Sequence, residues 1–74
     1  MDINRLVIMA NETGSFFEAL SDRAQASAEI ARHLKRFWDP GMRHALLQYV
    51  DREGGVNLKG IVLEAVRSHR SLLL

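Results

Sequence analysis

Three histidines are the side chains of this sequence best suited to proton transfer or metal binding. His33, His44 and His69 fall on three different predicted helices. His44 shares one helix face with Gln48 and Asp51, which follow it at helical spacing. This face supplies one imidazole and one carboxylate, whereas a zinc site needs three or four ligands held in place. The spacing therefore favours a solvated helix face over a metal centre.

The remaining carboxylates, hydroxyls and glycines form no other catalytic pattern. Glu12 and Glu18 stand six residues apart on one helix, so they do not face each other as an acid–base pair would. Ser27 has no histidine at a neighbouring helical position. The pair Gly54-Gly55 is not followed by the residues of a phosphate-binding loop. We therefore expect no catalytic, cofactor-binding or metal-binding residue, and a protein that is not an enzyme.

Composition sets further limits on the class of protein. The chain has 74 residues, of which 47% are apolar and 26% charged, which is typical of one small globular domain. It has no cysteine, which excludes disulfides, thiolate metal sites and iron–sulfur ligation. The net charge of +1 does not indicate a nucleic-acid partner. The first residues do not resemble a secretory signal, and no apolar run approaches the ~20 residues that span a membrane. We expect a cytoplasmic chain without membrane association.

Helices must position these residues, because apolar positions recur at three- and four-residue steps and no stretch alternates strictly. The sequence predicts an all-α domain of four helices, over residues 3–20, 22–38, 40–53 and 58–70. The apolar face of the second helix carries Ala24, with Ile30 at its margin, and Phe17 belongs to the apolar stripe of the first helix. Gly14 also lies within the stripe of the first helix. Glycine inside a helix costs about 1 kcal/mol relative to alanine, so we expect another helix to approach closely there.

Short polar residues and glycines mark the helix boundaries. The second helix can be capped by Ser21 or Asp22, and the fourth by Asn57. Asp39 is a good cap for the third helix, and Pro40 fits its first position. A Gly-Gly pair then ends the third helix.

Surplus apolar residues favour a protein partner. Single exposed apolar side chains are ordinary, but Met9 and Phe16 lie together on a helix that is apolar over more than one face. Methionine and aromatic residues are favoured at interface cores. The residues that lie off or beside the main stripes are Ile8, Met9, Phe16, Phe37, Leu47 and Leu63.

Two other classes of function stay open. A nucleic-acid-binding or regulatory protein would use the basic middle of the chain and a corner like that of a helix-turn-helix. The third helix, however, exposes only one permanently positive side chain and one negative side chain, so a protein partner is favoured over nucleic acid. A self-associating bundle would use the face of Ile8, Met9 and Phe16. The basic residues in question are Arg32, Lys35, Arg36, Arg43 and Arg52.

Three segments carry a family resemblance: INRLVIMANETGSFF, IARHLKRFWDPGMRHALL and DREGGVNLKGIV. Over roughly residues 3–66 they resemble the delta subunit of NAD-dependent, molybdenum-containing formate dehydrogenases. The most specific parts are Met9-Ala10-Asn11, Phe16-Phe17, and Phe37-Trp38 followed by Pro40 and Met42-Arg43.

The resemblance implies a small cytoplasmic subunit without a cofactor. Such a subunit would bind the large catalytic subunit that holds the molybdopterin, and would support assembly, cofactor maturation or complex stability. Formate oxidation, with electrons passing through iron–sulfur clusters and flavin to NAD, would belong to the other subunits. A homodimer of the isolated chain is a further expectation. The contact residues that match the family pattern are Arg5, Met9, Asn11, Phe16, Phe37, Trp38 and Arg43.

Two of these residues have a second interpretation from position alone. Trp38 stands in the middle of the apolar face of its helix, which favours a place in the core. Asn11 can cap or brace a loop, as short amide side chains commonly do.

Overall fold

The computed structural model describes residues 2–20 and 22–74, and every regular element in them is a helix. The all-α class predicted from the sequence is confirmed. A fifth, single-turn helix follows the four longer ones. The helices are α1 (Ile3–Phe17), α2 (Arg23–Phe37), α3 (Pro40–Glu53), α4 (Gly60–Ser68) and α5 (Arg70–Leu73).

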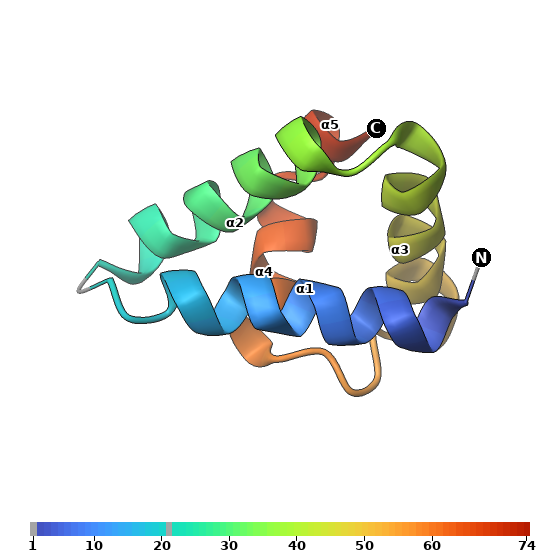
Figure 1. Cartoon of the computed structure of the whole chain (residues 1–74), viewed down its shortest axis with the longest axis horizontal. Helices are drawn as coiled ribbons and strands as arrows, with labels where there is room; N and C mark the ends of the chain where they lie inside the picture. Colours follow the sequence, from blue (N-terminus) through green and yellow to red (C-terminus); the bar gives the residue numbers. More distant parts are fainter. Residues whose placement is uncertain (1, 21) are drawn as a thin grey trace.

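The helices are arranged around α4. In Figure 1, α1 and α2 diverge from the turn that joins them, α4 runs between them, and α3 stands across their open side. Helix α4 contacts each of the other four helices, which makes it the centre of the packing. The short α5 lies beside the end of α2 and also contacts α3.

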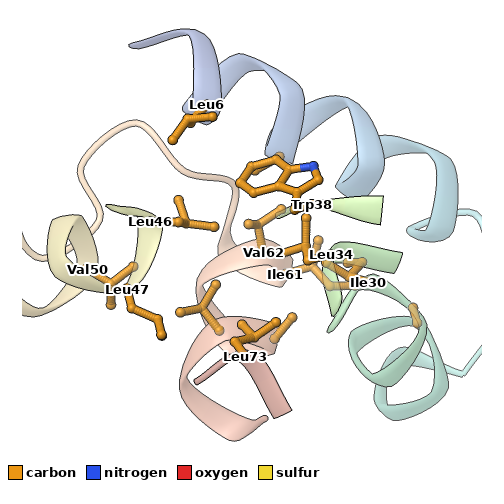
Figure 2. Close-up of a cluster of buried hydrophobic side chains, with 14 residues drawn as sticks. Leu6, Ile30, Leu34, Trp38, Leu46, Leu47, Val50, Ile61, Val62 and Leu73 are labelled. Atoms are coloured by element: carbon orange, nitrogen blue, oxygen red, sulfur yellow. The ribbon is translucent and has the colours of Figure 1, made fainter. Parts of the chain in front are cut away.

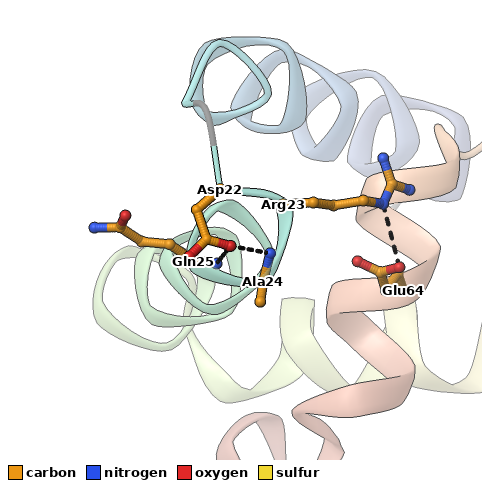
Figure 3. A network of polar contacts seen from close by, with 5 residues as sticks. All are labelled: Asp22, Arg23, Ala24, Gln25 and Glu64. Atoms are coloured by element: carbon orange, nitrogen blue, oxygen red, sulfur yellow. Dashed lines mark hydrogen bonds and ion pairs between the residues drawn. The ribbon is translucent and has the colours of Figure 1, made fainter.

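The start of α2 follows from its local sequence. Figure 3 shows the Asp22 carboxylate accepting hydrogen bonds from the backbone N–H groups of Ala24, at 3.0 Å, and Gln25, at 3.4 Å. These bonds satisfy donors that the first turn of a helix leaves free. The predicted Asp22 cap is confirmed, and the alternative, Ser21, lies outside the described residues.

The predicted corner between α2 and α3 is also confirmed. The Asp39 carboxylate accepts from the Met42 N–H at 2.9 Å, and Pro40 is the first residue of α3. At the other end Gly54 has φ 71°, the left-handed conformation that glycine adopts without strain. Asp39, Pro40 and Gly54 therefore set the two ends of α3 through local contacts.

Three predicted helix boundaries differ from the structure. Helix α1 ends at Phe17 rather than Leu20, and Leu20 is 40% exposed, so a longer helix would bury little more. Asn57 does not cap the fourth helix; it has φ 72° and lies in a turn before α4 begins at Gly60. The predicted single helix to residue 70 is interrupted at His69, where α5 changes direction.

The core lies where α4 meets the other helices, and Figure 2 shows its side chains. Helix α2 faces the core with a different edge than predicted. Ile30, expected at the margin, is fully buried, whereas Ala24, expected inside, is exposed. Leu47, expected as spare apolar surface, is buried, and Leu73 of α5 joins the core. The position of α4 sets this rotation, and the pattern of α2 alone could not give it.

Gly14 lies at the closest contact between α1 and α4. A Cβ atom at this position would stand 2.5 Å from Cγ2 of the fully buried Val62. The expected close approach of another helix is confirmed, and α4 is that helix.

Candidate partner-binding surface

The seven predicted contact residues separate into two groups. One group, which we call the internal clamps, uses its side chains for contacts within the chain and consists of Asn11, Trp38 and Arg43. The other group points outward or lies at the surface. It consists of Arg5, Phe16 and Phe37, which are exposed, and Met9, which is half-buried.

Asn11 connects α1 to the loop before α4. Its Oδ1 accepts from the backbone N–H of Lys59 at 2.9 Å, and its Nδ2 donates to the backbone carbonyl of Asn57 at 2.9 Å. One amide therefore satisfies two backbone groups far away in the sequence. The Lys59 that it binds is the residue just before α4, a helix that has no side-chain cap of its own. Of the two interpretations of Asn11, the loop brace describes its contacts.

Trp38 belongs to the core. Its side chain is buried, with 5% exposed, and Figure 2 shows its indole among the buried apolar residues. It is the residue at which α2 ends, with extended backbone angles that turn the chain toward α3. Its backbone carbonyl accepts from Arg43 Nη1 at 2.6 Å.

Arg43 is buried, with 8% exposed, and its guanidinium binds backbone carbonyls from two helix ends. Nη1 donates to Trp38 and to Lys35, at 2.6 and 3.2 Å, and Nε donates to Leu73 at 3.3 Å. The last carbonyls of a helix have no partner within it and carry its negative dipole end. Arg43 therefore ties the end of α2 to α5 as a buried cation.

The outward aromatic residues form a continuous row. Ring centroids are 5.0 Å apart for Phe16 and Phe17, 6.1 Å for Phe17 and His33, and 4.8 Å for His33 and Phe37. We call these four residues the aromatic strip. Its two ends are well exposed, with Phe16 at 74% and Phe37 at 66%. The strip crosses from the end of α1 to the end of α2.

A shallow hollow of about 180 Å³ lies along the α2 side of the strip. The Arg36 guanidinium carbon stands 5.8 Å from the centre of the Phe37 ring, within the range of a cation–π contact. Arg32 forms an ion pair with Glu29 one turn earlier. The hollow is lined by Phe17, Glu29, Arg32, His33, Arg36 and Phe37.

The outer face of α1 continues the surface. Met9 and Phe16 are two helical turns apart on this face. Arg5, Ile8 and Met9 line a shallow depression there, in which Ile8 is 60% exposed. This face adds aliphatic area next to the Phe16 end of the aromatic strip.

Sequence reasoning missed His33 as a surface residue of interest. Its ring packs at a tilt against Phe37, which follows it by four residues, and pairs at that spacing meet on a helix surface. That spacing was available in the sequence as a signal. Its neighbour Phe17 was assigned to the buried stripe, and it is half-buried between the core and the strip.

The possible ligand face of α3 is occupied by an ion pair. Arg70 of α5 donates to both carboxylate oxygens of Asp51, at 2.8 and 2.6 Å. These hydrogen bonds hold the pKa of the Asp51 carboxyl below its usual range. Within residues 2–20 and 22–74 no three histidine, aspartate or glutamate side chains gather closely enough for a metal ion. No helix in those ranges is both long and apolar enough to cross a membrane.

Comparison with known proteins gives the family. Searches among curated proteins and among solved structures found no match. Among protein families, residues 5–66 match the one described as the NADH-dependent formate dehydrogenase delta subunit FdsD. The matched segment includes all of α2 and α3, both ends of the aromatic strip and all three internal clamps. The chain therefore belongs to the FdsD family of formate dehydrogenase delta subunits.

Proposed function

We propose that this chain is a non-catalytic accessory subunit that binds the large, molybdopterin-holding subunit of a cytoplasmic formate dehydrogenase. In this role it supports assembly of the complex, maturation of the cofactor, or stability of the catalytic subunit. Formate oxidation and electron transfer belong to the other subunits. The observation that carries the proposal is the aromatic strip, exposed on a small scaffold whose signature polar residues face inward.

Exposed aromatic area of this kind is typical of an interface. Phe16 and Phe37 are 74% and 66% exposed, and Ile8 of the neighbouring face is 60% exposed. Burying apolar surface contributes about 25 cal/mol per Å². Aromatic residues and methionine are enriched at interface cores relative to the rest of a protein surface. A chain of 74 residues buries only part of its apolar surface on folding, so a partner adds stability.

Contacts of the basic residues weaken the nucleic-acid alternative. Arg43 is buried against three carbonyls, and Arg32 is paired with Glu29. These contacts engage two of the five central basic residues, so fewer positive charges are left to neutralise phosphate, which is the main source of affinity in nucleic-acid binding. The self-associating alternative uses the same exposed face and is separated by experiment.

The test is co-purification of the tagged chain from its native host. We expect the large oxidoreductase subunit to be recovered with it. Phe16→Glu should abolish this recovery while leaving the helical circular dichroism unchanged, because a 74% exposed ring contributes little to the fold. Val56→Glu is the matched control, since Val56 is a 60% exposed apolar residue outside the strip. Recovery of only the chain itself, or of nucleic acid, would contradict the proposal.

A further inference from the structure

The aromatic strip has a basic rim. Arg32 and Arg36 stand one helical turn apart on the second half of α2 and line the hollow beside the strip, and Lys35 lies between them in the sequence. The carboxylates on this part of the chain are already engaged, because Glu29 pairs with Arg32 and Asp39 caps α3. In the described part of the chain, Lys35 and Arg36 have no carboxylate within ion-pair distance. The rim therefore offers positive charge that the fold does not use.

The hollow beside this rim is suited to a single side chain. The rings of Phe17, His33 and Phe37 line it, and its volume is about 180 Å³. The Arg36 guanidinium lies over Phe37 at the edge of the hollow. A carboxylate that pairs with Arg36 would therefore stand next to whatever fills the hollow.

We infer that the strip recognises an acidic segment of the large subunit, in which an apolar side chain stands beside an aspartate or glutamate. The apolar side chain occupies the hollow between Phe17, His33 and Phe37. The carboxylate pairs with Arg36, whose planar fork is already oriented by the Phe37 ring. This inference rests on the proposed function and adds the chemistry of the partner segment to it.

A second copy of this chain is the rival occupant. Phe16 and Glu12 offer an aromatic ring and a carboxylate one helical turn apart, so a copy could present a similar pair. Two copies, however, carry the same net charge of +1, which gives no overall charge complementarity between them. The acidic segment of a different chain fits the basic rim better.

The first experiment measures binding of each variant to the purified large subunit produced without this chain. We expect Phe37→Ala and Arg36→Glu each to weaken binding at least tenfold, as truncation of a central anchor does. Arg36→Lys keeps the charge but loses the planar fork over Phe37, so it should weaken binding less than Arg36→Glu does. Arg67→Glu on α4 is the matched charge control, because Arg67 is also exposed, and it should bind like the wild type.

Failure of the inference and failure of the proposed function give different results here. If the wild-type chain does not bind the large subunit, the proposed function is wrong, and this inference falls with it. If the wild type binds and both Phe37→Ala and Arg36→Glu bind equally well, the proposed function stands and the inference is overturned. Rising salt should weaken wild-type binding more than that of Arg36→Gln, because the ion pair is screened.

The second experiment identifies the occupant directly. A photo-crosslinking benzoylphenylalanine replaces Phe37 in the assembled complex, and the crosslinked peptide is sequenced by mass spectrometry. We expect a peptide of the large subunit with an aspartate or glutamate within one helical turn of the crosslinked residue. A crosslink to a second copy of this chain, or to a segment without a carboxylate, would overturn the inference.

Discussion

The internal clamps and the aromatic strip reverse the usual distribution of side chains. Arg43 is 8% exposed, whereas Phe37, six residues before it, is 66% exposed. Arginine is almost never fully buried without partners, and phenylalanine is usually inside. All three clamps and both ends of the strip belong to the segment that matches the family. The difference teaches that one family segment meets two demands. Here a polar residue such as Arg43 fixes the fold, and an apolar residue such as Phe37 forms the accessible surface.

Physical chemistry explains each side of the reversal. A buried guanidinium is tolerated where several acceptors surround it, and the carbonyls at the ends of α2 and α5 provide three. An exposed phenylalanine does not stabilise the fold through burial, and its apolar surface stays available for contact with a partner. Substitutions in the clamps should therefore change folding, and substitutions in the strip should change binding.

The largest effect on folding is expected at Arg43. Arg43→Met removes all three hydrogen bonds and leaves buried carbonyls without a donor, so we expect a loss of about 3 kcal/mol in the free energy of unfolding. Urea denaturation followed by circular dichroism measures it. The matched strip variant Phe37→Ser should stay within about 0.5 kcal/mol of the wild type. Equal stability of the two variants would contradict the division between clamps and strip.

Gly14 gives the next largest effect, because it sets the distance between α1 and α4. Gly14→Ala places a methyl group 2.5 Å from Cγ2 of Val62, a β-branched side chain that cannot rotate freely. Overpacking of this kind costs about 1–3 kcal/mol, more than the 0.5–1 kcal/mol gained from helix propensity. Urea denaturation of the double variant Gly14→Ala/Val62→Ala checks the cause. Its loss of stability should be smaller than the sum of the two single losses, and a simple sum would show that the two residues do not meet.

Asn11 is expected to have a smaller effect, since its bonds lie near the surface. Asn11→Ala removes the acceptor for the Lys59 N–H and the donor to the Asn57 carbonyl, which should lower the free energy of unfolding by about 1–2 kcal/mol. Asn11→Asp keeps the acceptor for the Lys59 N–H and loses the donor to Asn57, so it should recover part of the loss. Thermal unfolding of the three proteins measures the order. An aspartate variant less stable than the alanine variant would contradict the bracing role.

The parts of the fold that depend on neighbouring residues could be predicted from the sequence. Asp22, Asp39 and Gly54 act within a few residues of their own positions, and the structure agrees with each of them. The close approach at Gly14 could also be predicted, although the identity of the approaching helix could not. These features depend on the types of residues that are close together in the sequence, so the sequence is sufficient to predict them.

Features that depend on distant contacts could not be predicted. The brace from Asn11 to Lys59 connects residues 48 positions apart, just before α4 begins at Gly60. The burial of Ile30 follows from where α4 packs. For the candidate surface, residue type and family pattern selected Phe16 and Phe37, but nothing in the sequence separated them from the buried Arg43. Exposure is a property of the whole packing.

The smallest effect is expected at an exposed ion pair that holds α5, the helix that Arg43 also contacts. Arg70 and Asp51 join α5 to α3 with both side chains close to half exposed, whereas Arg43 holds α5 from inside. The hydrogen bonds from Arg70 hold the pKa of Asp51 below the ordinary carboxyl value of about 3.9. A carboxyl whose pKa is lower in the folded state stabilises the fold above its unfolded pKa. That contribution is lost as the pH falls through the folded pKa.

We expect Asp51→Asn to be slightly less stable than the wild type at pH 7 and equally stable once the pH lies below both pKa values. Urea denaturation across this pH range measures the difference, which should also shrink in 1 M salt because exposed ion pairs are screened. If Asp51→Asn lowered the free energy of unfolding as much as Arg43→Met, the exposed ion pair would stabilise α5 as strongly as the buried Arg43 does. The proposed difference between the internal clamps and the exposed surface would then be wrong.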